Sequence, residues 1–292
     1  MCVDGIIVIN KGKGCTSHDV VRDIKKLFGV KVGHTGTLDP NATGVLPILL
    51  GKGTELSQFL ICHDKKYVAT LKLGIKTDSA DSEGHAIEEK EVDKELLTEE
   101  NVNCIFKNMT GKQKQIPPMY SAIKVNGKKL YEYARKGQSV DIPAREIEIY
   151  DLKLLNLNQE ENTIKFEINC SKGTYIRTVC ESIAERLGTV GYMQELERTM
   201  VGDFKIEDSI TIEELKQSYE DKNFIEKNLI TIEKFFMDKP EIQLNERKLE
   251  LVLNGVCISN EMNDGIVRIY NNRKFIGIAI NSDKKLKRKI II

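Results

Sequence analysis

A short apolar run near the start of the chain predicts a buried strand. It spans residues 5–10 and consists mostly of β-branched side chains between a glycine and an asparagine. A helix is expected next, because Ser17 can serve as its N-cap, apolar side chains recur at helical spacing over 20–28, and Gly29 follows where a terminating glycine belongs. Residues 33–44 fit neither the helical nor the strand period, so we interpret them as a loop.

Further along the chain, periodic segments continue to predict both strands and helices. Strands are predicted at 46–50, 67–73, 146–157 and 163–170, and helices after a Thr98 N-cap and at about 175–187. The order of these elements lacks the regular strand–helix–strand repeat of a doubly wound sheet. We therefore expect an α+β fold.

The pattern changes near Lys239 and Pro240. A charged stretch before this point, 207–228, is predicted to be helical; after it come one helix at 245–253 and short strands at 266–270, 275–280 and 289–292. We therefore expect two domains, a large one over 1–236 and a small β-rich one over 237–292.

Composition places the chain among ordinary folded proteins. Of its 292 residues, 40% are hydrophobic and 30% are charged, which is too apolar for a disordered chain and too polar for a membrane protein. No apolar run approaches the ~18 residues of a membrane span, and the first residues do not resemble a signal peptide. Seven cysteines without a C-x-x-C pair indicate reduced thiols. We expect a cytoplasmic protein.

The net charge is zero, but the charges are unevenly distributed. Residues 78–100 hold ten acids and two lysines, whereas 112–136 hold seven bases and one acid, and the tail at 284–289 is basic again. A run of like charge is most often a solvated face. Two basic segments in one neutral chain nevertheless favour an anionic polymer as a partner.

Familiar cofactor motifs are not found. Residues 51–54 lack the hydroxyl residue that follows the lysine of a phosphate-binding loop, and 79–84 lack the ligand pattern of a calcium loop, so we interpret the latter as a surface turn. Neither a G-x-S-x-G nor a G-x-G-x-x-G sequence is present. The four histidines are as scattered as the cysteines. We expect no cofactor and no metal.

The loop around Asp39 is the strongest candidate for chemistry. An Asp-Pro pair is common in ordinary turns. Here, however, three glycines lie within twelve residues, and His34 and Thr35 place polar groups near a single carboxylate. Such backbone either turns sharply or lets a large ligand approach closely.

Residues 33–44, with Asp39 at their centre, resemble the catalytic motif of the TruB family of tRNA pseudouridine synthases, which isomerise uridine 55 in the T loop. Four further segments resemble family motifs, in the family's order: 10–21, 66–78, 172–177 and 196–204. The resemblance covers about residues 5–204. Two positions depart from it: Gly12 stands where the family usually has proline, and Glu197 stands where it has the first of two arginines.

This resemblance implies a pseudouridine synthase fold, with a mixed, mostly antiparallel central sheet flanked by helices and a small PUA-like RNA-binding domain. The catalytic domain would be 1–236, with a basic insertion at about 111–140 that clamps RNA, and the PUA-like domain would be 237–292. The implied activity is an isomerase reaction that moves the glycosidic bond of a uridine from N1 to C5. It is redox-neutral and needs no cofactor.

The resemblance also implies roles for individual residues. Asp39 would act at the anomeric carbon, held ionised by a bidentate pair with Arg177, and Tyr67 would stack on the flipped uracil and handle the proton at C5. Tyr175 and Leu196 would line the uridine pocket, and His34 would fill the space that the flipped base leaves. RNA-binding residues of the insertion would be Lys124, Lys128, Lys129 and Arg135.

Alternatives remain open at this level. Taken singly, Arg177 could be a surface residue, Tyr67 an outward tyrosine on an alternating strand, and His34 a histidine hydrogen-bonded within its loop. The C-terminal unit could be a β cap on the catalytic domain. For the whole chain, we expect a monomer that acts on the T stem-loop of tRNA without a protein partner or a membrane. Its rivals are a guide-RNA-dependent synthase of the same superfamily and a non-catalytic tRNA-binding or folding protein.

Overall fold

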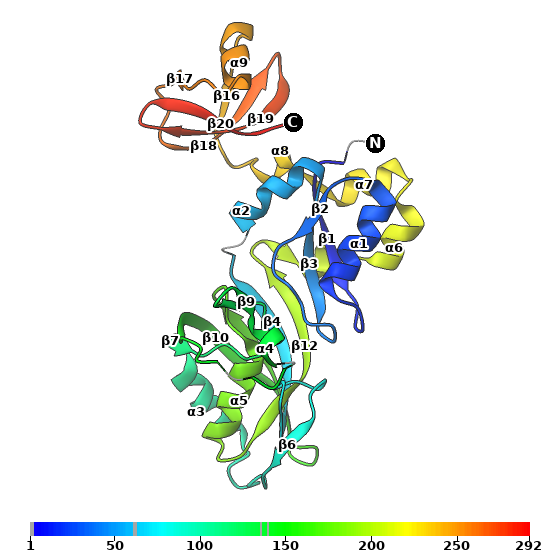
Figure 1. Cartoon of the computed structure of the whole chain (residues 1–292), viewed down its shortest axis with the longest axis vertical. Coiled ribbons are helices and arrows are strands. Elements are labelled where there is room, and N and C mark those ends of the chain that lie inside the picture. The colour runs from blue at the N-terminus through cyan, green and yellow to red at the C-terminus, as the bar shows by residue number, and fades with distance from the viewer. Residues whose placement is uncertain (1–2, 61–62, 135, 139) are drawn as a thin grey trace.

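The computed structural model describes residues 3–60, 63–134, 136–138 and 140–292 (Figure 1). Seen with its long axis vertical, the molecule is elongated, and a small C-terminal sheet lies at one end of a larger body. The body is built on one long twisted sheet whose strands come from both halves of the chain. No helix in the described parts of the chain is long and apolar enough to cross a membrane.

The body contains an eleven-stranded sheet. Its main path runs β14 (Ile210–Thr211), β1 (Gly5–Lys11), β3 (Thr43–Leu50), β12 (Gly191–Val201), β4 (Lys65–Leu73), β11 (Thr163–Cys170), β10 (Arg145–Asn158) and β7 (Gly111–Gln115), and β2 (Val32–His34), β13 (Phe204–Lys205) and β15 (Leu229–Thr231) pair beside it. Only the β1–β14 and β12–β3 pairs of this sheet are parallel among the described strands. The expected α+β fold with a mixed, mostly antiparallel sheet is confirmed.

Helices flank this sheet. They are α1 (Ser17–Phe28), α2 (Ser57–Leu60), α3 (Glu99–Met109), α5 (Ile176–Arg186), α6 (Ile212–Ser218), α7 (Lys222–Asn228) and α8 (Ile232–Phe235), with 3₁₀ turns η1 (Gly51–Leu56) and η2 (Ile206–Asp208). The short helix α4 (Leu130–Ala134) lies instead on a segment that projects from the body. The predicted N-cap of α1 is wrong by one residue. Thr16 caps the helix through the backbone of Asp19, because the Ser17 hydroxyl is turned inward, where it accepts from the amide of Leu38 and donates to its carbonyl.

The apolar run that begins the chain is buried on both faces. In β1, Ile7 and Ile9 belong to a core formed with α1, α3 and α5, while Ile6 and Val8 belong to a second core on the opposite face. Successive side chains of a strand point to opposite faces, so a strand between two cores has no polar positions to alternate with. This explains why its sequence is continuously apolar.

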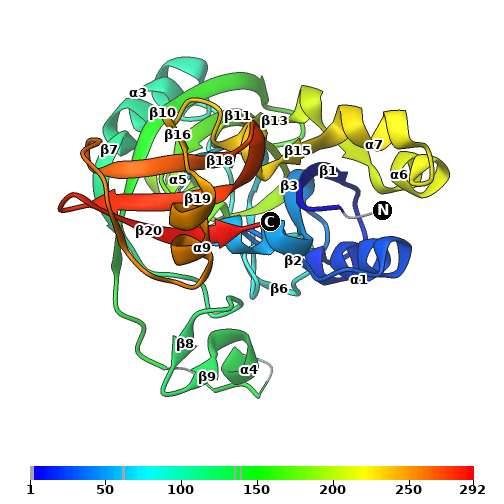
Figure 2. The same ribbon diagram turned by 90° about the horizontal axis from the view of Figure 1, so that it is seen from above.

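The C-terminal unit is a separate five-stranded sheet. Its order is β16 (Glu241–Gln243), β18 (Gly265–Asn271), β19 (Lys274–Ser282), β20 (Lys285–Ile291) and β17 (Ile258–Ser259), with α9 (Glu246–Leu253) packed on it. The expected β-rich unit is confirmed, although its last strand begins at Lys285 rather than 289. Figure 2 shows this sheet lying across the body, and its Ile278 and Ile290 share the second core with Phe236.

Two hairpins leave the body. The hairpin of β5 (Ile75–Thr77) and β6 (Ala86–Glu89) lies at the opposite end of the molecule from the C-terminal sheet (Figure 1). The hairpin of β8 (Lys124–Val125) and β9 (Lys128–Lys129) projects from the body together with α4 (Figure 2). The predicted loop at 33–44 is irregular only over 35–42, because its first two residues pair in β2 and its last two in β3.

Candidate active site

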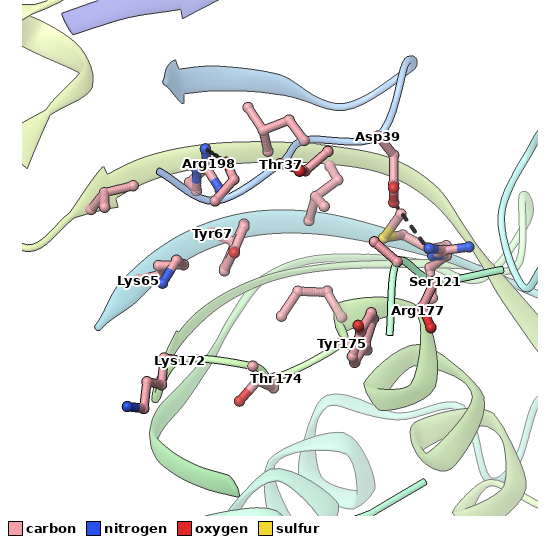
Figure 3. Close-up of a pocket in the computed structure, with 18 of the residues that line it drawn as sticks. Thr37, Asp39, Lys65, Tyr67, Ser121, Lys172, Thr174, Tyr175, Arg177 and Arg198 are labelled. Carbon is pink, nitrogen blue, oxygen red and sulfur yellow. Dashed lines mark hydrogen bonds and ion pairs between the residues drawn. The ribbon is translucent and has the colours of Figure 1, made fainter. Parts of the chain in front are cut away.

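A cavity of about 520 Å³ brings together five of the six residues predicted to act in the reaction or to bind the uridine. Its volume falls within the range of about 300–1,000 Å³ that is usual for ligand pockets. Its walls come from the loop after β2, from β4 and β12, from the base of the β8–β9 insertion, and from the turn that opens α5. Asp39, Tyr67, Tyr175, Leu196 and Arg177 all line it, and Figure 3 shows the first three and Arg177 facing a common space.

The loop that carries Asp39 is fastened at the next residue. The carbonyl of Pro40 accepts hydrogen bonds from the amide of Gly14 and from the ammonium of Lys11, both at 3.0 Å. Lys11 is fully buried and also donates to the carbonyls of Gly12 and Cys15. Burial lowers the pKa of Lys11, while the negative charge of Asp39 opposes that shift. The loop is therefore held by a cation in the interior.

Asp39 lies against a buried arginine. The Arg177 Nε is 3.4 Å from Asp39 Oδ2, and its Nη1 is 3.2 Å from Oδ2 of Asp81. The remaining guanidinium bonds go to the carbonyls of Ser79 and Tyr120, at 3.1 and 2.8 Å. The expected bidentate pair is thus wrong, because the guanidinium is divided among four acceptors. The interpretation of Arg177 as a surface residue is also wrong, since its side chain is only 7% exposed.

The charge of Asp39 is set by opposing effects. Burial raises the pKa of its carboxyl group, Arg177 lowers it, and the negative charge of Asp81 raises it again, with smaller lowering effects from Lys11 and Arg198. The Asp39 side chain is still 40% exposed, through the mouth of the cavity. Arg177 is the one charged group within ion-pair distance among the described residues, so it is the principal support of the ionised form.

Asp81 belongs to the site, although the sequence placed it in an acidic surface run. The surface interpretation of 79–84 is wrong at its centre, where Ala80 and Asp81 are 4% and 8% exposed. The turn folds inward, and its Asp81 carboxylate lies against the guanidinium of Arg177. In the sequence, Asp81 is one acid among many in a charged segment. Such a segment has the same composition whether all of its acids face solvent or one of them contacts a buried cation, so the sequence alone did not distinguish Asp81.

A second buried arginine supports Tyr67 on the other side of the cavity. Arg198 is 1% exposed and donates to the carbonyls of Val45 and Gly36, at 2.8 and 2.9 Å, and its positive charge lies near Tyr67. Burial raises the pKa of Tyr67 to about 12, against the opposing influence of Arg198. Tyr67 is 7% exposed and lines the cavity, so its interpretation as an outward tyrosine is wrong.

The approach of β12 to β3 at Arg198 requires a glycine. Gly44 has a φ of +101°, and a Cβ placed on it would lie 2.2 Å from the carbonyl oxygen of Arg198. Only glycine allows two backbones to come this close. The last glycine of the Asp39 loop therefore serves packing, and through this packing it brings Arg198 under the loop.

Tyr175 and Leu196 complete the apolar wall. Tyr175 is the N-cap residue of α5, and the amide of Gln115 fixes its backbone by accepting from its N–H at 2.8 Å and donating to its carbonyl at 3.0 Å. Leu196 points from β12 into the cavity and is 9% exposed. Both were predicted as pocket residues. Gln115, which positions one of them, was not predicted from the sequence.

His34 lies beside the cavity and outside its lining. It pairs with Ile48 in the short β2–β3 ladder, and the next residue, Thr35, is the first of the loop to line the cavity. Burial and the positive charge of Arg198 lower the pKa of His34, which keeps it neutral. Its Nδ1 is buried without a hydrogen-bond partner among the described residues, so that nitrogen does not support the interpretation of a histidine bonded within its loop.

The predicted RNA-binding lysines lie on the projecting insertion. Lys124 and Lys128 are exposed, and Asn126 and Gly127 turn the hairpin between them with positive φ angles. Lys129 is half-buried, with its ammonium 5.4 Å from the ring centre of Tyr131. Arg135 lies outside the described residues. The base of this insertion, at Tyr120 and Ser121, lines the cavity, so the lysines and Asp39 share one side of the molecule.

Comparisons with known proteins agree along the whole chain. The sequence profile described as "TruB family pseudouridylate synthase (N terminal domain)" matches residues 23–176. Those described as "tRNA pseudouridylate synthase B C-terminal domain" and "Pseudouridine synthase II TruB, C-terminal" match 177–237 and 240–289. No group of three metal-binding side chains occurs in the described parts of the chain.

Curated relatives and solved structures match over nearly full length. Proteins named tRNA pseudouridine synthase B from Francisella philomiragia and Caldanaerobacter subterraneus are 43% and 41% identical; the alignments cover 98% and 99% of this chain and 94% and 99% of theirs. A chain of a Cbf5-Nop10-Gar1 complex superimposes with a TM-score of 0.70 at 25% identity, over 99% of this chain and 84% of its own. This chain and the matched chain of that complex thus share one fold. With relatives this similar along its entire length, the chain belongs to the TruB family of pseudouridylate synthases.

Proposed function

We propose that this protein converts a uridine of tRNA to pseudouridine, and that its target is uridine 55 in the T loop. The family and the names of its full-length relatives support a tRNA uridine isomerase. The observation that carries the proposal is the placement of Asp39 in the loop motif, against Arg177, in a cavity of nucleoside size. The position in tRNA rests on the sequence motif.

Asp39 acts at the C1′ carbon of the target. The reaction breaks the N1–C1′ bond, turns the uracil over within the cavity and joins C5 to C1′; C5 then loses its proton and N1 gains one, so that the product is an isomer of the substrate. An ionised carboxylate stabilises the positive charge that develops at C1′, or bonds to that carbon, while the base is detached. Arg177 keeps Asp39 ionised and directs it toward the cavity. No redox partner enters the balance of this reaction.

The other pocket residues receive the flipped base. The ring of Tyr67 stacks on the uracil, and its hydroxyl handles the proton at C5 with the guanidinium of Arg198 beside it. Tyr175 and Leu196 give the uracil an apolar surface that offsets the loss of stacking in the RNA. His34, adjacent to the cavity and neutral, occupies the space that the base leaves in the T loop.

The insertion and the C-terminal unit hold the tRNA. The lysines of the β8–β9 hairpin contact phosphates on the cavity side, and residues 237–292 form a PUA-like RNA-binding domain whose last strand carries Lys285, Lys287 and Lys289. Phosphate contacts of this kind set affinity and orientation rather than the choice of base. We propose a cytoplasmic monomer that needs no protein partner.

Tritium release tests the proposal directly. A tRNA transcript that carries [5-³H]uridine is incubated with the wild type, with Asp39→Asn, and with Asp151→Asn as a matched control at an exposed aspartate. We expect one tritium released per tRNA by the wild type and by the control, and none by Asp39→Asn. Mapping of the product then locates the modified position. Release at a position other than 55 would overturn the site assignment, and no release by the wild type would overturn the activity.

The same assay decides the guide-dependent alternative. A stand-alone enzyme releases tritium from the bare transcript, whereas a guide-dependent synthase is inactive without a second RNA. The identity to full-length proteins named tRNA pseudouridine synthase B, at 41–43%, exceeds the 25% identity to a chain of the Cbf5-Nop10-Gar1 complex and favours the stand-alone form. Tight tRNA binding without release would favour the non-catalytic alternative.

A further inference from the structure

The turn between β5 and β6 makes two contacts with the Asp39–Arg177 pair through one residue. The carbonyl oxygen of Ser79 accepts a hydrogen bond from Arg177 Nη1 at 3.1 Å. Its hydroxyl donates at 2.6 Å to Oδ1 of Asp81, whose Oδ2 is 3.2 Å from the same Nη1. Ser79 therefore contacts the guanidinium directly and also orients the second carboxylate that contacts it.

The backbone around Ser79 is fixed from several directions. Ala80 adopts a left-handed conformation with a φ of 60°, which is unfavourable for a residue with a Cβ, and its carbonyl accepts from the amide of Met193 in β12. The Thr77 hydroxyl donates to the carbonyl of Asp81, and the amide of Glu83 donates to its carboxylate. A strained conformation that persists beside an active site is held there by its surroundings.

We propose that Ser79 is a positioning residue for the reaction, which sets the distance between Arg177 and Asp39 by holding Asp81 and Arg177 together. At 3.4 Å, the Arg177–Asp39 contact is the longest polar contact described for this guanidinium, and so the one most easily lost when its other partners move. Without the Ser79 hydroxyl, Oδ1 of Asp81 keeps the amide of Glu83 as a donor but loses the shorter of its two hydrogen bonds. The carboxylate is then less restrained, and Arg177 shifts with it away from Asp39. The inference rests on the proposed function and extends it to a residue outside the catalytic group.

The consequence for Asp39 follows from the charges around it. Arg177 of α5, Lys11 of β1 and Arg198 of β12 are the nearby cations, and Asp81 and Glu83 of the turn are the nearby acids. Among these, only Arg177 is within ion-pair distance of Asp39. When Arg177 moves away, the acids prevail and the pKa of Asp39 rises. Because the ionised form is the active one, a larger fraction of the enzyme is then inactive at neutral pH.

The test compares Ser79→Ala with Ser82→Ala, an exposed serine of the same turn, in full-length protein. Single-turnover rates of pseudouridine formation are measured from pH 5.5 to 9, together with tRNA affinity. For Ser79→Ala we expect a loss of about 5- to 50-fold near pH 7. Its acid limb should move to higher pH by about half a unit or more, so that the loss shrinks as the pH rises. Affinity should stay at the wild-type value, and Ser82→Ala should match the wild type throughout.

A merely structural role for Ser79 predicts a different result. Its loss would lower the rate by the same factor at every pH, together with lower thermal stability or weaker tRNA binding, and that outcome overturns the proposal. So does a Ser79→Ala rate profile identical to the wild type. A second readout does not depend on catalysis: the carboxyl ¹³C shift of Asp39, followed against pH, should show a higher pKa in Ser79→Ala. If the wild type released no tritium while this shift was seen, the proposed function would fail and the positioning role would stand.

Discussion

Two buried arginines flank the Asp39 loop, and they are satisfied by different kinds of partner. Arg177 lies against two carboxylates, Asp39 and Asp81, and also donates to two backbone carbonyls. Arg198 lies under the loop and donates to two backbone carbonyls, with no carboxylate within ion-pair distance among the described residues. Both arginines crosslink backbone, but only Arg177 also balances the charge of a carboxylate.

This difference separates two requirements of the site. The carboxylate must be ionised, which needs a nearby cation, and the loop that carries it must keep its shape, which needs donors for buried carbonyls. We therefore expect that replacing Arg177 lowers mainly the reaction rate and that replacing Arg198 lowers mainly the stability.

The largest expected effect is on the rate, upon loss of Arg177. Arg177→Met leaves Asp39 and Asp81 facing each other without a cation between them, so the pKa of Asp39 rises. We expect the single-turnover rate at pH 7 to fall by about 10³-fold or more. Since the ionised form is restored above the raised pKa, part of the loss should be recovered at pH 9. A loss that is equal at all pH values would contradict the charge-balancing role.

The next effect is on stability, upon loss of Arg198. Arg198→Met keeps most of the side-chain volume but leaves the carbonyls of Gly36 and Val45 without their Arg198 donor. We expect the free energy of unfolding to fall by about 3 kcal/mol, measured by urea titration. The control is Arg186→Met, at an exposed arginine of α5, with an expected change within about 0.5 kcal/mol. Equal losses in both variants would remove the distinction between the two arginines.

Replacing exposed cations is expected to have a smaller effect, and to affect tRNA binding. Replacing Lys124 and Lys128 together by alanine should weaken tRNA binding about tenfold near physiological salt and reduce the slope of log K against log salt by about 2. The single-turnover rate at saturating enzyme should not change, since neither lysine lines the cavity. Lys107→Ala, at an exposed lysine of α3, is the control. A rate loss with unchanged affinity would show that these lysines act on the chemistry.

The smallest expected effect is at Gly12, where the family usually has proline. A Cβ on Gly12 meets no atom within 4 Å, and its φ lies outside the left-handed region. Gly12→Ala should therefore stabilise the protein by about 0.5 kcal/mol by restricting the unfolded chain, without changing the rate. Thermal unfolding and tritium release check the two parts. If Gly12→Ala destabilised the protein, the turn at Gly12 would be needed, together with Lys11 and Arg198, to hold the Asp39 loop in place.

The fold was predictable where hydrophobic periods were regular. Strands β1, β3, β4, β10 and β11 and helices α1, α3 and α5 were predicted from the sequence. The central strand β12 was not predicted. It pairs with β4 through two register shifts, near Met193 and near Arg198, and each shift breaks the alternation of inward and outward side chains. A strand of eleven residues with two such shifts has no simple period to detect.

The site residues that belong to sequence motifs could be predicted. Those that reach the site only through the tertiary structure could not. Asp39, Tyr67 and Arg177 come from recognisable motifs. Asp81 and Gln115 carry no local signal, because an aspartate in an acidic run and a glutamine at the end of a short strand are ordinary on a surface. The fully buried Arg198 illustrates the same limit: charged residues are expected outside, and only the carbonyls it meets across the fold explain its burial.

The packing of the C-terminal sheet bears on how this protein can be divided. Leu60 and Val201 line the cavity and also belong to the core that contains Ile278 and Ile290 of that sheet. A fragment ending at residue 236 would leave part of the cavity wall facing water on its rear side. Shortened versions for engineering should therefore keep the last two strands, because part of the catalytic cavity is supported from behind by the C-terminal sheet.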